Sequence, residues 1–439
     1  MDYHIDFEKY IKAVERCISI ELEGRVVKVV GLIVEATGLN MGIGSLCSIY
    51  TDHNEVILSE VVGFREDRVL LMPYGDVRGI RGGSRVVLLE KGPEAEVGDS
   101  LLGRVLDGMG QPLDSLPHPV HTVRYPLYGK PVNPLQRKPI TELMDVGVSA
   151  INTIIPLGRG QRVAIMAGSG VGKSVLMGMM AKHTEADVTV IGLVGERGRE
   201  VKDFVEHNLG ADGLKKSVVV AATSDTSPLV RMRGAYLATT IAEYFRDQGK
   251  HVLLIIDSIT RFAMSSRDVG LSAGEPPTNR GYTSSFFVRI PILLERAGNI
   301  EGKGSITGIY TVLVEGDDLN DPVGDTVRSI VDGHIVLSRK LANRGHYPAI
   351  EVLESVSRVA RDVASPEHIE LRERTIRILS AYASAEDMIS IGAYAKGSNP
   401  VIDQAIALKP KLDELLRQPM DRRENCAIAL NKLKAIYYS

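Results

Sequence analysis

A glycine-rich stretch at residues 167–174, Ala-Gly-Ser-Gly-Val-Gly-Lys-Ser, has the composition of a phosphate-binding loop. Apolar residues 163–166 precede it and a helix-forming run follows, so the loop joins a strand to a helix. Glycines let backbone N–H groups converge on phosphate oxygens, and the start of a helix adds the positive end of its dipole. The residues expected to bind a nucleotide are Gly168, Ser169, Gly170, Val171, Gly172, Lys173, Ser174 and Val175.

Two side chains of this loop have specific predicted roles. Lys173 is expected to reach the outer phosphates, and the Ser174 hydroxyl is expected to bind Mg²⁺. The first position is Ala167, where the strict pattern has glycine. Glycine-rich turns also close ordinary strand–helix units, which is the alternative to nucleotide binding. The complete Gly-Lys-Ser ending and the flanking elements favour the nucleotide.

A second candidate is Asp257, which ends the apolar run 253–256. In a parallel sheet this carboxylate lies at the carboxyl end of its strand, where ligands bind. There it can hold a water of the Mg²⁺ shell. The alternative is an N-cap for the next helix. Its place downstream of a phosphate loop favours the metal role.

The third candidate is the segment 195–200, Gly-Glu-Arg-Gly-Arg-Glu, directly after the apolar run 188–194. Hydrolysis of a terminal phosphate requires a group that orients water, and positive charge on the phosphoryl oxygens. Glu196 can polarise the water, Arg197 can stabilise the developing charge, and Glu200 can steady the outer shell of the metal. A solvated charge cluster that caps a helix explains these residue types equally well.

The whole composition excludes several classes of protein. The 52 basic and 55 acidic residues nearly balance, which counts against a general nucleic-acid or membrane-surface role. The three cysteines are far apart in sequence and suit a reducing compartment. The N-terminus does not resemble a secretory signal, and no apolar run approaches the ~20 residues of a membrane span. We therefore expect a soluble, cytoplasmic protein of two or three domains.

Patterning along the chain predicts four parts that position these residues. Residues 1–23 form an amphipathic helix, which docks either on its own barrel or on a partner. Short β-branched runs between glycine turns predict a small β-barrel over 24–92. Residues 93–364 form an α/β domain with a mostly parallel sheet, entered through an extended proline-rich wrap at 112–139. Residues 365–439 are helical. The apolar face of the first helix comprises Phe7, Tyr10, Ile11, Val14 and Ile18.

The individual elements follow from hydrophobic periodicity. The barrel strands are predicted at 26–30, 47–50, 55–58, 68–72 and 85–88. The strands of the α/β domain are predicted at 162–166, 188–194, 218–222, 252–257 and 305–314. Its helices are predicted at 173–182, 199–207, 229–248 and 260–266.

The order of these motifs resembles that of the rotary ATP synthase catalytic subunits and their relatives. Residues 348–357, Pro-Ala-Ile-Glu-Val-Leu-Glu-Ser-Val-Ser, are similar to the signature decapeptide of that superfamily. Within it the chain resembles the type III export ATPases, and most closely the flagellum-specific ones. This closer resemblance lies in the phosphate loop and in residues 274–278, 294–299 and 310–318. It extends from about residue 24 to the C-terminus.

This resemblance implies a RecA-like P-loop domain and a homohexameric ring, with ATP and Mg²⁺ bound between neighbouring subunits. It implies that Glu196 is the catalytic carboxylate and that Arg197 and Arg261 lie near the terminal phosphate. Tyr347 is similar to the tyrosine that stacks on adenine, and Arg358 to the arginine that reaches into the neighbour's site. The alternatives are a core-packing tyrosine and a surface arginine. No second aromatic residue for the adenine is evident in the C-terminal helices.

The resemblance also implies a function, namely Mg²⁺-dependent ATP hydrolysis that energises flagellar protein export and promotes release of substrates from chaperones. The implied partners are a stator-like regulatory protein at the N-terminal helix, the export gate and chaperone–substrate complexes. The implied location is peripheral, at the cytoplasmic face of the export apparatus, and no nucleic acid is expected.

Four other functions are weighed against this one. The first is the ATPase of a virulence type III secretion system, whose motifs are nearly identical. A rotary synthase subunit is disfavoured because the C-terminal helices lack an acidic Asp-Glu-Leu-Ser-Glu-Glu-Asp run. A catalytically dead subunit is disfavoured by the presence of Glu196, and an RNA-translocating ring by the balanced charge.

Overall fold

The computed structural model describes residues 23–53, 55–90, 92–314 and 321–438. The helix predicted over residues 1–23 lies outside these ranges, except for Glu23, which begins a strand. The chain divides into two compact units, and each is described by itself below. They comprise Met1–Pro93 with Leu271–Glu275, and Glu94–Gly270 with Pro276–Ser439.

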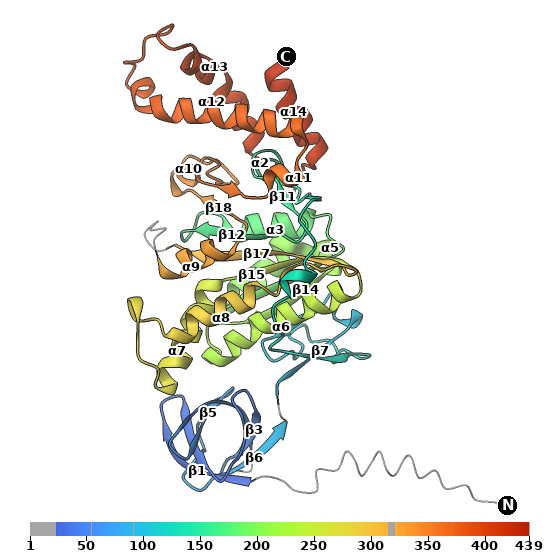
Figure 1. Cartoon of the computed structure of the whole chain (residues 1–439), viewed down its shortest axis with the longest axis vertical. Helices are drawn as coiled ribbons and strands as arrows, with labels where there is room; N and C mark the ends of the chain where they lie inside the picture. Colours follow the sequence, from blue (N-terminus) through green and yellow to red (C-terminus); the bar gives the residue numbers. More distant parts are fainter. Residues whose placement is uncertain (1–22, 54, 91, 315–320, 439) are drawn as a thin grey trace, which may run out of the picture. The chain divides into compact units, whose positions relative to one another are not determined.

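The first unit contains a closed β-barrel with the strand order β1-β2-β5-β4-β3-β6 (Figure 1). Neighbouring strands are antiparallel all round the barrel. Apolar side chains such as Val34, Ile49 and Leu71 fill the interior. The strands are β1 (Glu23–Val30), β2 (Ile33–Thr37), β3 (Leu46–Tyr50), β4 (Val56–Arg65), β5 (Arg68–Pro73) and β6 (Arg85–Glu90).

Strand β2 is absent from the sequence prediction because Glu35 interrupts its apolar run. In the barrel Glu35 is only 3% exposed. Its two carboxylate oxygens accept hydrogen bonds from Arg65 at 3.0 Å and from Arg68 at 2.8 Å. The hydrogen bond from Arg68 outweighs burial, so the pKa of Glu35 is lowered. Val34 and Ala36 on either side of it face the barrel core, so Glu35 lies on the opposite face of β2, where the two arginines pair the buried charge.

The second unit is built on a sheet that, within the described residues, has nine strands in the order β19-β18-β12-β17-β15-β13-β14-β8, with β16 beside β17. Every pairing from β18 to β8 is parallel, whereas β19 and β16 are antiparallel to their neighbours. The prediction of a mostly parallel sheet is confirmed. Its strands are β8 (Val105–Asp107), β12 (Arg162–Ala167), β13 (Val188–Val194), β14 (Ser217–Ala222), β15 (His251–Asp257), β16 (Gly298–Asn299), β17 (Ser305–Leu313), β18 (Gly333–Leu337) and β19 (Val356–Ser357).

Helices alternate with these strands, as the pattern predicts (Figure 1). They are α2 (Ser149–Ile154), α3 (Lys173–His183), α4 (Gly198–Asp203), α5 (Gly210–Lys215), α6 (Pro228–Asp247), α7 (Ile259–Ala273), α8 (Ser284–Leu294), α9 (Pro322–Ile330), α10 (Arg339–Asn343) and α11 (Ala360–Val363). Short 3₁₀ turns are η1 (Asp99–Leu101), η2 (Pro134–Gln136) and η4 (Asn279–Gly281). Two small antiparallel sheets pair β7 (Glu94–Val97) with β9 (Val123–Pro126), and β10 (Leu143–Met144) with β11 (Leu157–Gly158).

One predicted helix, 199–207, has a different form in the structure. A single π-helical stretch, η3 (Phe204–Leu209), separates α4 from α5. It packs closely on α3, since a Cβ atom at Gly178 would lie 2.7 Å from the Asn208 Cβ. This close approach of η3 to the helix after the phosphate loop depends on a glycine at position 178.

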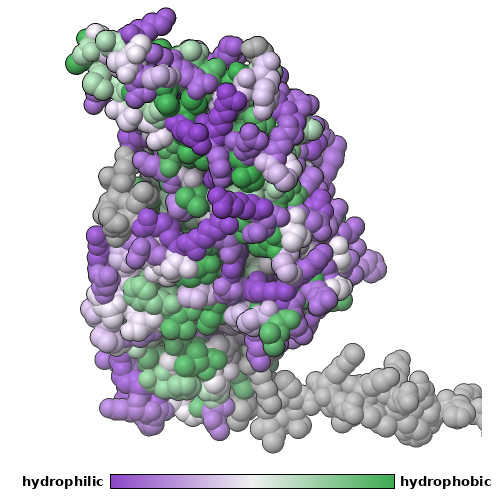
Figure 2. Space-filling view, turned by 45° about the horizontal axis from the view of Figure 1, so that its top comes forward, coloured by the Kyte–Doolittle hydropathy of each residue, from purple (hydrophilic) through white to green (hydrophobic). Residues whose placement is uncertain are grey.

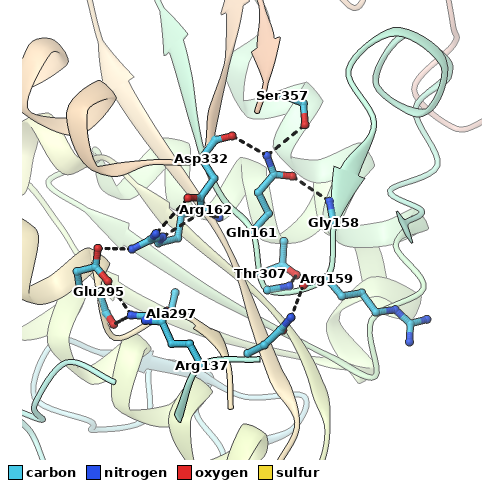
Figure 3. A network of polar contacts seen from close by, with 12 residues as sticks. Arg137, Gly158, Arg159, Gln161, Arg162, Glu295, Ala297, Thr307, Asp332 and Ser357 are labelled. Carbon is cyan, nitrogen blue, oxygen red and sulfur yellow. Dashed lines mark hydrogen bonds and ion pairs between the residues drawn. The ribbon is translucent and has the colours of Figure 1, made fainter. Parts of the chain in front are cut away.

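A network of charges fixes the start of β12, the strand that leads into the phosphate loop (Figure 3). The Arg162 guanidinium donates to both carboxylate oxygens of Asp332 at 3.1 Å and pairs with Glu295. Glu295 also accepts from Arg137 at 2.7 Å, and the Gln161 amide donates to the Asp332 carbonyl at 3.0 Å. Burial lowers the pKa of Arg162, but the two acids outweigh it and leave that pKa raised. The strand is thereby tied to three segments distant in sequence.

The C-terminal residues form the predicted helical domain, with α12 (Pro366–Ser390), α13 (Pro400–Leu416) and α14 (Cys426–Tyr438) (Figure 1). Their buried leucines, including Leu371, Leu412 and Leu433, join the same hydrophobic cluster as Ile151 of α2. None of the described helices combines the length and hydropathy needed to cross a membrane. The face in Figure 2 mixes hydrophilic and hydrophobic patches.

Candidate active site

The phosphate loop joins β12 to α3, as predicted. Ala167 is the last residue of β12; it is 1% exposed and belongs to the hydrophobic core. The alanine at the first motif position therefore belongs to the strand, and its methyl group packs in the core and not in the loop. Gly170 and Gly172 have positive φ values of 77° and 90°, which glycine adopts without strain. Backbone N–H groups and the start of α3 thus come together where phosphate is expected.

A cavity of about 950 Å³ lies over this loop and collects most of the predicted residues. Of those residues, the lining includes Gly168, Ser169, Gly170, Gly172, Lys173, Ser174, Val175, Glu196, Arg197, Glu200 and Arg261. Val171 is buried in the core instead. The two motifs that the sequence places more than twenty residues apart therefore share one site, because β13 and β12 end at the same edge of the sheet.

Lys173 links the three predicted motifs. Its ammonium contacts the carboxylate of Asp257 and lies 3.4 Å from Oε1 of Glu196. Asp257 is 2% exposed at the end of β15 and accepts a hydrogen bond from the Thr311 hydroxyl at 2.6 Å. Lys173 thus contacts both carboxylates, at the wall of the cavity that it shares with Glu196.

Glu196 follows directly after β13 in a tight turn. Gly195 has φ +76°, which favours glycine. A Cβ atom there would also lie 2.8 Å from the Arg261 Cβ, so both the backbone conformation and the space require glycine. Burial raises the pKa of Glu196, and the neighbouring Glu200 raises it further, while Lys173 opposes them. A half-buried carboxylate with a raised pKa facing a nucleotide cavity has the properties of a group that orients and polarises water.

Two arginines supply positive charge to the same cavity. Arg197 is exposed at the N-cap of α4, and Arg261 lies on the first turn of α7. The Nε of Arg261 is buried and has no hydrogen-bond partner within the described part of the chain. Guanidinium groups in this position can stabilise charge on phosphoryl oxygens.

The oxygen donors suit Mg²⁺. Within the described ranges no group of three His, Cys, Asp or Glu side chains could hold a metal ion. The Ser174 hydroxyl and the Glu200 carboxylate line the cavity, and Asp257 lies beneath it. Mg²⁺ prefers oxygen ligands and in nucleotide sites is held largely by phosphates and water, so this donor set fits the ion.

Tyr347 borders both the loop and a second cavity. A Cβ atom at Gly172 would lie 3.4 Å from the Tyr347 ring, which is 47% exposed. The second cavity, of about 810 Å³, is lined by Tyr347, by Tyr382 of α12 and by residues after α13 such as Gln418. Tyr382 is a second aromatic side chain in this lining, and the Lys409 ammonium lies 5.2 Å from the centre of its ring; the helical spacing of Tyr382 is equally that of a core residue.

Arg358 is not part of this arrangement. Its side chain is exposed and donates to the Arg328 carbonyl at 3.2 Å, and it lines neither cavity. The lining contains further residues that the sequence analysis does not name: Ser224, Thr260, Met264, Leu313, Val314 and Arg339. All but Arg339 lie at or just after the carboxyl ends of strands β14, β15 and β17, so the edge of the predicted sheet was the signal for them, whereas Arg339 follows β18, which was not predicted.

Known families match this chain in three parts. Residues 147–357 match the nucleotide-binding domain of the ATP synthase alpha/beta family, and residues 26–89 match the beta-barrel domain of that family. Residues 364–435 match the T3SS EscN ATPase C-terminal domain.

Whole proteins match as well. The chain is 51% identical over 430 residues to the flagellum-specific ATP synthase of Salmonella typhimurium, covering 95% of this chain and 94% of that protein. It is 49% identical over 416 residues to that of Bacillus subtilis, covering 94% and 95%. The assembled ATPase EscN of the enteropathogenic E. coli type III secretion system has a similar structure, with a TM-score of 0.90 and 42% identity over 94% of this chain and 99% of that one. EscN in complex with its central stalk EscO gives a TM-score of 0.87 at 41% identity, with the same coverage.

Proposed function

This chain belongs to the flagellum-specific members of the ATP synthase alpha/beta family, and we propose that it is the ATPase that energises protein export through a flagellar type III apparatus. The curated relatives at 45–51% identity are flagellum-specific proteins, which favours flagellar export over a virulence system. The match of residues 364–435 to an export ATPase domain counts against a rotary synthase subunit.

The observation that carries the catalytic proposal is the contact between Glu196 and Lys173 in the cavity over the phosphate loop. Lys173 and the loop N–H groups bind the outer phosphates of ATP. Glu196 holds a water in line with the terminal phosphate and takes up proton density as the water attacks. Arg197 and Arg261 stabilise the charge that develops on the phosphoryl oxygens.

Ser174, with Glu200 and Asp257 in the outer shell, would hold Mg²⁺. When bound, the ion would offset the negative charge of the phosphates. Tyr347 stacks on the adenine. Ser174 and Glu200 are assigned because they line the cavity, Asp257 because it contacts Lys173, and Tyr347 from the family resemblance.

The proposed working form is a homohexamer on the cytoplasmic side of the export apparatus. Its support is the similarity to EscN, which is described as assembled and in complex with a central stalk. In such a ring the exposed Arg358 reaches the nucleotide of the neighbouring subunit. The N-terminal helix binds a stator-like regulatory partner, and the ring engages the export gate and chaperone–substrate complexes.

The direct test is Glu196→Gln, which keeps the size and hydrogen bonding of the side chain but removes its charge. ATP binding is expected to be near normal, and turnover to fall by roughly two to four orders of magnitude. Steady-state ATPase assays and titration with a fluorescent ATP analogue measure the two quantities. Retained turnover would assign the water to another residue, and absence of ATPase activity in the unaltered chain would refute the proposed function itself.

A further inference from the structure

Gln418 has an unusual position for a polar side chain in the loop between α13 and α14. It is only 5% exposed, and all of its amide atoms are engaged. The side-chain Oε1 accepts a hydrogen bond from the Ser149 N–H at 2.8 Å. The side-chain Nε2 donates to the Gly147 carbonyl at 2.8 Å and to the Arg422 carbonyl at 2.5 Å. One carboxamide therefore joins the start of α2 to its own loop.

Only an amide satisfies these three partners together. The Ser149 N–H is one of the unpaired donors at the start of α2 and needs an acceptor, whereas the two carbonyls need donors. A carboxylate at position 418 would satisfy Ser149 but would face two carbonyl oxygens without a proton. The Gly147 carbonyl would keep the Glu424 N–H as a donor, but a carboxylate would still place a negative acceptor against two carbonyl oxygens, so the site favours glutamine over glutamate.

The backbone of the same residue continues the link to the nucleotide site. The Gln418 N–H donates to the Tyr347 carbonyl at 2.9 Å, and both residues line the second cavity. The Gly147 carbonyl also accepts from the Glu424 N–H at 3.1 Å, which closes the loop on α2. The backbone of Tyr347 is thus held by the backbone of Gln418, and the side-chain amide of Gln418 in turn holds Gln418 against the start of α2.

We propose that Gln418 is a positioning residue for the base side of the nucleotide site, acting through Tyr347. It orients the tyrosine that stacks on adenine without itself reacting. This inference rests on the proposed role of Tyr347, and it adds Gln418 as the residue that holds the tyrosine in position. A residue with this role affects the affinity for ATP and leaves the hydrolytic step unchanged.

The experiment compares Gln418→Glu with Gln418→Met, which lacks all three polar contacts at similar volume. The exposed Gln404 of α13 supplies the matched control, Gln404→Glu. In the full chain, Gln418→Glu is expected to raise KM for ATP roughly tenfold while kcat changes by less than about twofold. Inorganic tripolyphosphate has no base, so its inhibition constant against ATP hydrolysis is expected to be unchanged. Gln404→Glu is expected to leave all three values unchanged.

A double variant tests the route through Tyr347. Tyr347→Ala alone is expected to raise KM, and adding Gln418→Glu is expected to raise it little further, because both changes remove the same interaction. Equal losses in kcat and in tripolyphosphate binding, additive effects of the two changes, or an unaltered KM would each overturn the proposal. Failure of both Gln418 variants to fold, measured by circular dichroism, would assign the residue a structural role and overturn it as well. An active wild-type chain with any of these results leaves the ATPase function intact.

Discussion

At the scale of single residues, the site is governed by the contact of one lysine with two carboxylates. Lys173 contacts Asp257 and Glu196, and it opposes the upward shift that burial and Glu200 impose on the pKa of Glu196. The carboxylate must be ionised to take up proton density from water. With Glu196 as the proposed base, activity is therefore expected to fall as the pH drops through its raised pKa.

This arrangement predicts how the pH profile responds to Glu200→Gln. Removal of the neighbouring acid lowers the pKa of Glu196, so the acid limb of the kcat/KM profile is expected to move to lower pH. This shift is expected whether or not the maximal value of kcat/KM changes. Steady-state assays across the acid range measure the limb. Glu206→Gln is the control, since Glu206 is exposed on η3. An unmoved limb, or one moved to higher pH, would contradict the assigned coupling.

Residue types alone indicated much of the site but not all of it. The loop, Asp257 and the segment around Glu196 were predicted, because strands that end at one sheet edge bring their next residues together. Arg339, which donates to the Ser169 carbonyl at 3.1 Å, could not be predicted, since a surface arginine at the start of a helix has no distinctive spacing. The roles of Arg358 and Tyr347 came from resemblance and remain predictions.

At the scale of elements, the five strands predicted for the α/β domain lie within one or two residues of their predicted bounds, whereas the barrel strand β4, predicted at 55–58, extends to Arg65. β13 has the predicted bounds, while β8 has only three residues and too little periodicity to identify. β2 was missed because the ion pairs that neutralise Glu35 come from strands β4 and β5. The π-helical stretch η3 likewise depends on its contact with α3 and leaves no sign in its own sequence.

The turn after β13 provides a prediction at this scale. Gly195→Ala places an L-residue at positive φ, at a cost of about 1–2 kcal/mol, and displaces Arg261. Lower thermal stability and a lower kcat are expected together. The control is Gly198→Ala, where a Cβ atom would meet open space, and a change within about 0.5 kcal/mol is expected. Thermal melts and ATPase assays compare the two variants. Equal effects would show that the turn at position 195 accepts a side chain and does not require glycine.

At the scale of the whole molecule, the position of Arg358 bears on assembly. Its guanidinium lines neither cavity of its own chain, so a role in hydrolysis requires a second subunit. An arginine supplied in trans to a phosphoryl group typically contributes ~10³–10⁵ in rate. Activity is then a property of the interface between subunits.

Mixing variants tests this role. Arg358→Ala and Glu196→Gln are each expected to form rings and hydrolyse ATP poorly. In mixed rings, some interfaces pair a wild-type Glu196 with a wild-type Arg358 of the neighbour, so activity is expected to return in part. The measurement is ATPase rate against mixing ratio, with native mass spectrometry to show mixed rings. Activity that stays at the average of the two variants in such rings would exclude a shared site.

The helix predicted for residues 1–23, most of which lie outside the described ranges, gives a further prediction for the full chain. Deletion of residues 1–18 is expected to abolish binding of the stator-like partner and to leave the barrel folded, because the described barrel closes from Glu23 onward. Co-purification with the partner and a thermal melt measure the two properties. Aggregation of the shortened protein would mean that the helix completes the core of the barrel.

The sheet order has a consequence for how the chain is made. β12 carries the phosphate loop, yet the strands on both sides of it, β17 and β18, are translated much later, and the Arg162 contacts at its start reach a residue 170 positions on. The barrel, by contrast, draws on consecutive residues and can fold as soon as it leaves the ribosome. The nascent chain therefore carries its nucleotide motif as an unflanked apolar strand until the last third of the protein emerges, so the enzyme acquires its barrel early and its active site late.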